Sequence, residues 1–481
     1  MSSIDLALRG VAEERPIPKH RHTMRTIALC ISTALAAAAT GSFAGTSRNA
    51  QPSGHHAADM PTTPFASQTW TVKNCKDSGP DSLRDIIENP MNAKSGDTID
   101  LGELPVRCGM VDSKITLGSE IKVKQDDLYL YGPTEGSVTI SGAGTSRVFL
   151  HEGYGTLVLN GLSVVEGYFH AVNNAYGGCI ESDHGDITLN HVTVENCVVM
   201  SDTGFPNGGG VSARHGNVTL IASNVSHNEA KASGTHATFG GGVYSEGSTF
   251  AWYSTISHNT AKDGKGGGIA SGGITLIAST INDNVGGYGG GISSFGSAMI
   301  ENATISQNTA SKAGGALILD ADTTIANSTI AFNKTEQANA PGGIVFYGTS
   351  TTDKLTLQSS IISNNTSASA NSDIFIYPGY GTLAGANNLV IASNVSNPMV
   401  ITLTSDPKLG PLQSNGGPTQ THMLMPGSPA LGKGNITALP PTFTADQRGP
   451  GYPRTTGQNA SVDLGAVQFD SIFSDSFNWQ F

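Results

Sequence analysis

The sequence predicts an all-β solenoid, a single-stranded parallel β-helix, from three observations. The chain has 481 residues, of which 60 are Gly and only 13% are charged, about half the charged share of ordinary globular domains. A Gly-rich phrase with three short β-runs recurs between positions 177 and 365. Within that phrase an asparagine returns at one register. Together these features are typical of a chain that coils repeatedly over itself.

The first 44 residues have the features of a secretory signal peptide. The apolar run Ile27–Ala39 follows several basic residues and precedes Ala44. It is too short to span a bilayer, which takes about 20 apolar residues. We therefore expect export, with cleavage near Ala44. Met24 would itself be an ordinary signal start, so residues 1–23 can be an upstream extension.

Residues 69–98 are expected to cap the N-terminal end of the solenoid. Asp81–Glu88 starts with helix-capping residues and carries paired apolar positions, the pattern of a short helix. Such a helix would cover the apolar core and the strand edges of the first coil. The other predicted segments are a flexible leader at 45–68, the β-helix at 99–397, a Pro- and Gly-rich irregular module at 398–470 that closes the last coil, and a tail at 471–481.

The repeat defines the coil. Its instances begin 23 to 32 residues apart, and none carries an apolar stripe of helical period, which excludes the helical solenoids. Three short strands in each repeat fit a parallel β-helix whose coils stack about 4.8 Å apart. The instances begin at Gly177, Gly208, Gly240, Gly266, Gly289, Gly314 and Gly342.

Residues one coil apart should lie directly above one another, so the sequence predicts three stacked rows. The first aliphatic column comprises Ile180, Val211, Val243, Ile269, Ile292, Leu317 and Val345. The second aliphatic column comprises Val194, Val225, Ile256, Ile281, Ile305, Ile330 and Ile362. The asparagine ladder, in which side-chain amides bond from coil to coil, comprises Asn228, Asn259, Asn284, Asn308, Asn333 and Asn365. Cys197 takes the ladder register in the first repeat.

Four cysteines remain after the signal peptide, an even number that suggests disulfides in an exported protein. Proximity in the sequence favours Cys75 with Cys108 and Cys179 with Cys197, among three possible connectivities. No CxxC pair argues for zinc. The sequence therefore predicts neither a metal site nor a cofactor.

Several segments resemble known families. Gly177–Asn394 resembles the pectin-lyase-like right-handed parallel β-helix class, and the GGAL at Gly314 resembles the repeat of polymorphic outer-membrane proteins. The segment from Cys75 resembles the SLR-type leader of secreted bacterial β-helix proteins, and the tail from Asp406 (DPKLGPLQSNGGPTQTHM, then ADQRG and VDLGAVQF) is similar to the choice-of-anchor Q domain. These resemblances imply a right-handed helix and a secreted or surface-associated bacterial protein, and they carry over no catalytic residue.

One group of charged residues falls at shared registers of neighbouring coils. These residues are Asp183, His184, Arg214, His215 and Glu246. On a carbohydrate-active β-helix they could supply the base and cations of uronide lysis or the two carboxylates of hydrolysis. The alternative is an exposed ladder of alternating charges, which contributes a fraction of a kcal/mol per pair.

Loop lengths suggest a binding wall. The segments 198–207 and 229–239, between the ladder register and the next Gly, are longer than those of the other repeats. Insertions on one edge of a solenoid often form a binding surface, and Tyr176, Phe205 and Phe239 near these loops could stack on sugar rings. The alternative is drift in loop length, which surface loops tolerate.

These observations predict an exported surface or extracellular protein, adhesin-like or polysaccharide-binding and non-catalytic. The alternatives are a polysaccharide lyase or glycoside hydrolase acting on acidic glycans, and a purely structural envelope protein. A net charge of −12 leaves no basic stripe for nucleic acid. The expected partners are polysaccharide or cell-surface glycans, with peripheral or anchored association with the bacterial envelope, and the protein is expected to be a monomer.

Overall fold

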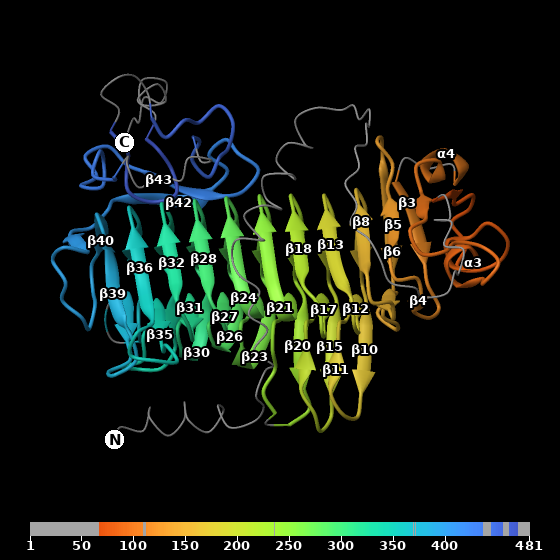
Figure 1. Ribbon diagram of the computed structural model, residues 1–481, viewed down its shortest axis with the longest axis horizontal. Helices are drawn as coiled ribbons and strands as arrows, with labels where there is room; N and C mark the ends of the chain where they lie inside the picture. The colour runs from red at the N-terminus through yellow and green to blue at the C-terminus, as the bar shows by residue number, and fades with distance from the viewer. Residues whose placement is uncertain are drawn as a thin grey trace, which may run out of the picture. The chain divides into compact units, whose positions relative to one another are not determined.

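The computed structural model describes residues 67–108, 112–234, 236–368, 370, 372–435, 444–455 and 461–469. The predicted signal peptide, nearly all of the leader and the tail lie outside these residues. The described chain is an all-β parallel β-helix, consistent with the predicted right hand (Figure 1). Among the described strands, only β42 (Leu409–Gln413) and β43 (Thr421–Leu424) pair antiparallel as a hairpin.

Most coils contribute two strands to sheet A, which is 20-stranded and runs the length of the β-helix. Its strands are β1 (Thr69–Thr71), β2 (Thr98–Asp100), β4 (Ile121–Val123), β5 (Leu128–Tyr131), β7 (Phe149–His151), β8 (Thr156–Asn160), β12 (Ile180–Ser182), β13 (Asp186–Asn190), β17 (Val211–Ala213), β18 (Val218–Ile221), β21 (Val243–Trp252), β24 (Ile269–Ile277), β27 (Ile292–Ser294), β28 (Ala298–Glu301), β31 (Leu317–Leu319), β32 (Thr323–Ala326), β35 (Ile344–Phe346), β36 (Lys354–Gln358), β38 (Ile374–Ile376) and β39 (Thr382–Ala386).

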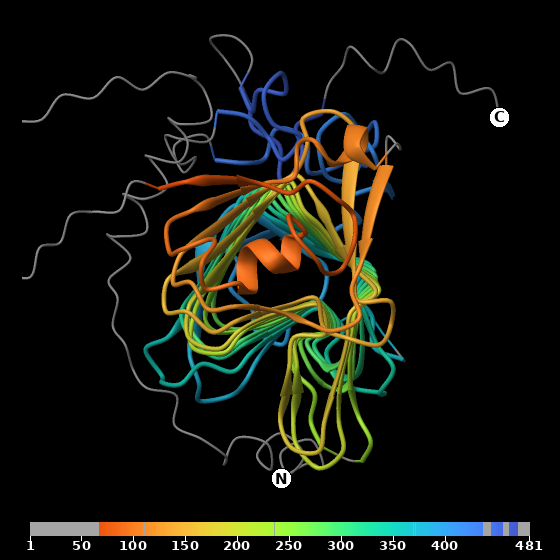
Figure 2. The ribbon, with the colours of Figure 1, turned by 90° about the vertical axis from the view of Figure 1, so that its right-hand side faces the viewer.

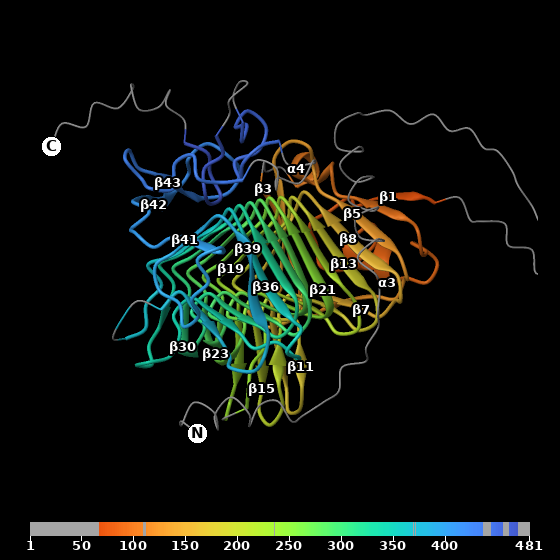
Figure 3. The same ribbon diagram turned by 60° about the vertical axis from the view of Figure 1, so that its left-hand side comes forward.

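Sheet B contains 12 strands, one from each coil. They are β3 (Asp112–Thr116), β6 (Ser137–Ser141), β9 (Ser163–Val165), β14 (Thr193–Glu195), β19 (Asn224–Ser226), β22 (Thr255–Ser257), β25 (Thr280–Asn282), β29 (Thr304–Ser306), β33 (Thr329–Ala331), β37 (Ile361–Ser363), β40 (Asn388–Val390) and β41 (Ile401–Leu403). The view in Figure 3 shows these stacked strands edge to edge.

Sheet C contains seven strands from the middle coils. They are β10 (Tyr168–Ala171), β15 (Val198–Ser201), β20 (Glu229–Ala232), β23 (Thr260–Lys265), β26 (Val285–Tyr288), β30 (Thr309–Ala313) and β34 (Lys334–Thr335). Beside it, β11 (Ala175–Tyr176) pairs with β16 (Pro206–Asn207). In Figure 1, β10, β15 and β20 extend farther from the body than the later coils do.

Both aliphatic columns form the core, with one correction. The second column pairs residue by residue as predicted. The last residue of the first column is Ile344, which pairs with Leu317. The sequence predicted Val345, but Val345 is the next residue of the strand, so its side chain points to the outer face. The backbone N–H of Leu317 donates to Gly343 O as that of Ile292 donates to Ala316 O one coil earlier, so Gly343 corresponds to Ala316 and Gly342 to Gly315, the second residue of its repeat. Counting from Gly342 therefore shifted the prediction by one residue.

The glycine that begins each coil is required by its backbone. Gly240 has φ +61°, a conformation that side chains disfavour, and a Cβ there would lie 2.0 Å from the carbonyl oxygen of Val243. The corresponding glycines of neighbouring coils adopt nearly the same φ. The recurrence of Gly in the sequence thus reflects one tight corner repeated from coil to coil.

The asparagine ladder is confirmed and buried throughout. Each Asn donates both its backbone N–H and its Nδ2–H to the Oδ1 of the next Asn, from Asn228 to Asn365. At the first end, the backbone N–H of Cys197 donates to Asn228 Oδ1 at 3.0 Å. At the last end, Asn365 donates to Asp373 Oδ1. The sequence did not predict that Asp373 ends the ladder.

Both predicted disulfides are present. Cys75 is bonded to Cys108 and Cys179 to Cys197. The first ties the N-terminal cap to the segment before β3, and the second closes a corner of the core beside the ladder. Because disulfides persist in oxidising compartments, both bonds favour an extracellular location.

The predicted cap helix covers the N-terminal end of the core. It is α3 (Leu83–Glu88), with Ser82 accepting a hydrogen bond from the backbone N–H of Asp85 as N-cap. Leu83, Ile86 and Ile87 are buried in the main core. Figure 2 shows α3 lying across the opening of the coils. A second short helix, α4 (Leu104–Arg107), follows β2.

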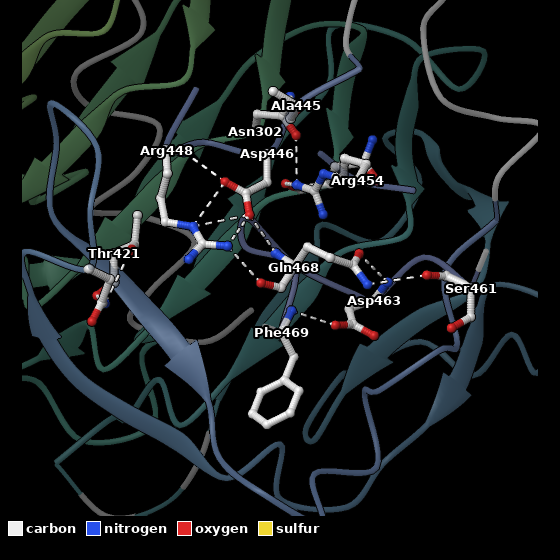
Figure 4. Close-up of polar contacts among 12 residues, drawn as sticks. Asn302, Thr421, Ala445, Asp446, Arg448, Arg454, Ser461, Asp463, Gln468 and Phe469 are labelled. Atoms are coloured by element: carbon white, nitrogen blue, oxygen red, sulfur yellow. Dashed lines mark hydrogen bonds and ion pairs between the residues drawn. The ribbon is translucent and has the colours of Figure 1, made fainter. Parts of the chain in front are cut away.

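The C-terminal segment lies against the side of the β-helix, whereas the sequence predicted that it closes the last coil. Gln447 bonds to Thr280 and Thr304 on sheet B, and Arg454 Nη2 donates to Asn302 Oδ1 at 2.7 Å. Figure 4 shows Arg454 next to the buried ion pair of Asp446 with Arg448. The end of the main core is instead reached by residues 395–401, whose Val400 is buried in it.

Candidate functional site

The predicted charged residues lie on the outer face of sheet A, just beyond the inward column. The backbone N–H of Asp183 donates to His151 O and that of Arg214 to Ser182 O, so the two residues follow each other at one register. Glu246 lies at the equivalent place in β21. The structure therefore brings together Asp183, His184, Arg214, His215 and Glu246, which we name the charged cluster.

The charged cluster consists of local acid–base pairs. Arg214 Nη1 donates to Asp183 Oδ1 at 2.9 Å, and His184 Nδ1 lies 3.5 Å from Asp183 Oδ2. His215 Nδ1 lies 3.0 Å from Glu246 Oε2, and the His184 and His215 rings are 5.8 Å apart between centroids. These side chains are one-third to one-half exposed. Such pairs contribute little stability in water and leave no cation without an acid beside it.

Next to this cluster lies a buried ion pair that the sequence analysis missed. Arg147 Nη2 lies 2.6 Å from Glu181 Oε2, and Arg147 Nη1 lies 3.0 Å from Glu120 Oε2. The Arg147 guanidinium also donates to Gly177 O and stacks on the Phe169 ring at 3.7 Å. It is 2% exposed and holds the loop before β12 in place.

Burial controls the protonation of Glu181. Desolvation raises the pKa of Glu181 to about 7, and the nearby carboxylates of Asp183 and Glu120 add to this effect, while Arg147 opposes it. The sequence carried a signal for this residue, because it directly follows the inward Ile180 and so must face outward. Arg147 carried no such signal, since it lies in the irregular opening coils.

The three predicted aromatic residues gather with two others into one group, which we name the aromatic cluster: Tyr176, Phe205, Phe239, Tyr244 and Phe295. Phe239 is its centre, with ring centroids 6.1 Å from Phe205, 6.3 Å from Tyr244 and 6.2 Å from Phe295. Tyr244 in turn lies 6.4 Å from Tyr176. All five rings are partly exposed.

Cations border the aromatic cluster on two sides. The Arg214 guanidinium lies 4.9 Å from the centroid of Tyr176, and Lys265 Nζ lies 5.2 Å from that of Phe295. Arg214 thus joins the aromatic cluster to the charged cluster in one continuous surface. Tyr244 could have been found from the sequence, because it follows the inward Val243 and must face outward.

The two long loops position Phe205 and Phe239 of the aromatic cluster. The segments 198–207 and 229–239 contain β15, β16 and β20; Phe205 lies two residues before the end of the first, and Phe239 ends the second. Phe239 bridges in parallel to Asn207 and to Lys265, so the loop ends are stacked like the coils themselves. The insertions are therefore ordered β-structure that brings the two rings to the edge of sheet A.

Among the described residues, no group of three or more His, Cys, Asp or Glu side chains could hold a metal ion. No helix in the same part of the chain is long and apolar enough to cross a membrane. Comparison with protein-family models, with curated proteins and with solved structures finds no match. The fold is therefore established from the structure, and the family resemblances of single segments stay predictions.

Proposed function

We propose that the protein is an exported, non-catalytic polysaccharide-binding protein of the adhesin-like kind, which binds glycans on the aromatic cluster. The observation that carries this proposal is the continuous contact of five partly exposed rings, drawn from several coils. Rings with bordering polar groups are typical of ligand sites, because the ring face binds apolar surface while the polar groups fix orientation. The apolar C–H faces of sugar rings suit such a surface.

The scaffold favours binding without rearrangement. The rings are fixed on paired strands or beside them, and the corner of β12 is held by the Cys179–Cys197 disulfide and by the buried Arg147. A preformed site loses little side-chain entropy on binding. The disulfides also suit an exported protein, for which we propose a monomer in peripheral or anchored association with the bacterial envelope.

A non-catalytic role is supported by the pairing within the charged cluster. Arg214 is already bonded to Asp183, and His215 to Glu246. A lyase needs cations directed at the substrate carboxylate and an accessible base. These partners would have to separate before either residue could act on an acidic glycan.

The test is binding of the purified mature protein to pectic, alginate, glycosaminoglycan and neutral β-glucan polysaccharides. We expect binding to at least one polymer without turnover, and an affinity at least tenfold weaker for Phe239→Ala, about 1.4 kcal/mol. Tyr131→Ala is the matched control, because Tyr131 is 41% exposed on β5 and outside the aromatic cluster. Unsaturated products that disappear in Arg214→Ala would instead identify a lyase.

A further inference from the structure

A second group of aromatic rings lies on the outer face of sheet A near its C-terminal end. Tyr347 and Tyr377 stack with ring centroids 4.6 Å apart. Tyr377 also lies 6.2 Å from Phe375 and 5.8 Å from Tyr380. Tyr380 is exposed and the other three rings are partly exposed. We name these four residues the distal aromatic cluster.

Backbone hydrogen bonds place Phe295 of the aromatic cluster and two residues of the distal aromatic cluster on one outer row. The backbone N–H of Phe295 donates to Ser271 O, that of Asp320 to Ser294 O, and that of Tyr347 to Leu319 O. The backbone N–H of Tyr377 continues the series by donating to Phe346 O. Each of these residues follows the first strand of its coil, so the row runs along the helix axis. The three coil steps from Phe295 to Tyr377 span about 14 Å at 4.8 Å per step.

The full row is much longer than a single sugar. Seven coil steps separate the β12 coil, which carries Tyr176, from the β38 coil, which precedes Tyr377. At about 4.8 Å per step this distance is roughly 34 Å. A ligand that contacts rings at both ends must therefore be an extended chain.

Charges along the row are unfavourable for an acidic chain. Asp320 lies between the two aromatic clusters, at the register between Phe295 and Tyr347, where burial raises the pKa of its carboxyl and nearby Lys265 opposes that shift, so the charge on this row comes mainly from Asp183 and Glu246. Asp183 and Glu246 lie on the same row toward its other end, and Arg214 is paired with Asp183. A polyanion laid along the axis would meet these carboxylates with few unpaired cations to offset them.

We propose, resting on the proposed function, that the polysaccharide is uncharged and lies along the helix axis across both aromatic clusters. The aromatic cluster near the long loops is the larger and binds short chains by itself. The distal aromatic cluster adds a second contact that only long chains reach. Linking two contacts through one chain strengthens binding without any change at the first.

Calorimetric titration with β-1,4-linked gluco-, manno- and xylo-oligosaccharides tests this proposal, with trisaccharides and octasaccharides compared. Wild-type protein should bind one octasaccharide at least about tenfold more tightly than its trisaccharide. Tyr377→Ala should remove this difference and leave the trisaccharide affinity unchanged, and Phe239→Ala should weaken both. Tyr380→Ala, at an exposed ring, repeats the test without risk to folding, and Tyr131→Ala is the control.

The failures are distinguishable. If Tyr377→Ala and Tyr380→Ala bind the octasaccharide like wild type while Phe239→Ala does not, the second contact is refuted and the proposed function stands. Tighter binding of an octasaccharide of homogalacturonan than of the uncharged chains would overturn the uncharged ligand. If wild-type protein binds no glycan at all, both proposals are wrong.

Discussion

Asn284 donates twice to one oxygen of Asn308: its Nδ2–H at 2.9 Å and its backbone N–H at 3.0 Å both reach Oδ1. Asn284 Oδ1 accepts the same two bonds from Asn259, and its Nδ2 also donates to Ile256 O. The side chain is fully buried, so no water replaces these partners. One amide therefore satisfies two backbone groups of the coil before it and also bonds the side chain of the next Asn.

Asn284→Ala should be strongly destabilising. It leaves the backbone N–H and the side-chain amide of Asn259 without their acceptor and Ile256 O without its donor, and each unsatisfied buried group costs about 1–3 kcal/mol. We expect a loss of roughly 3–5 kcal/mol in the free energy of unfolding, measured by denaturant titration. The control Asn173→Ala, at an exposed residue of the loop before β11, should change stability by less than about 0.5 kcal/mol. Equal effects of the two substitutions would contradict the ladder's role.

Removing the disulfide that the ladder starts from should weaken the same region. Cys179 and Cys197 are 18 residues apart, and a loop of this size predicts a loss of about 3 kcal/mol in the Cys179→Ser, Cys197→Ser double variant. The Cys75→Ser, Cys108→Ser variant is the comparison, because that bond joins the cap rather than the coils. Melting temperature with and without reducing agent checks both. A melting temperature of the wild type that does not respond to reduction would speak against the prediction.

Glu181 should make stability depend on pH. Its pKa is raised from 4.5 to about 7 in the folded chain. Between these two values the folded chain holds a proton that the unfolded chain has lost, so stability decreases as pH rises from about 4.5 to about 7. The Glu181→Gln variant should lose this part of the slope, roughly 1–3 kcal/mol. Unfolding measured at several pH values in this interval checks the sign, and identical slopes for both proteins would refute it.

The C-terminal segment should depend on Gln447 for its position. The buried amide Nε2 donates to Thr280 Oγ1 and Thr419 Oγ1, and Oε1 accepts from Thr304. Gln447→Leu leaves the Thr304 hydroxyl without its acceptor, a cost of about 1–3 kcal/mol, and removes the donor to the Thr280 and Thr419 hydroxyls, which keep their bonds to Gln420 O and Ala278 O. We expect limited proteolysis to cleave this segment faster, while circular dichroism of the β-helix is unchanged. Gln413→Leu, at an exposed residue of β42, should leave the cleavage rate as in wild type.

Features that depend on the repeat could be predicted from the sequence. Vertical neighbours such as Val211 and Val243 share a register, so the columns and the ladder follow from counting residues. The Cys179–Cys197 bond was predicted from proximity in the sequence. Counting failed in the last repeat, because Gly342 corresponds to Gly315, the second residue of the preceding repeat, and not to Gly314, the first. It also missed the Arg147–Glu181 pair, whose partners belong to one irregular and one regular coil.

The aromatic cluster was predicted in part for the same reason. Phe205 and Phe239 lie in the long loops, whose lengths are visible in the sequence. Tyr244 and Phe295 belong to ordinary coils, where only the alternation of the strand shows that they face outward. The position of the C-terminal segment on the β-helix could not be predicted from the repeat, because contacts such as Arg454 with Asn302 join residues with no shared sequence pattern.

The two ends of the asparagine ladder differ from its middle. At one end the donor is the backbone N–H of Cys197, and at the other end the acceptor is the carboxylate of Asp373. Each Asn in the interior of the ladder accepts hydrogen bonds from the Asn before it and donates the same kind of bonds to the Asn after it. Duplication or deletion of a whole interior coil would therefore lengthen or shorten the row of surface rings without leaving an unmatched amide in the ladder. The distance between the two aromatic clusters can therefore change during evolution in steps of one coil.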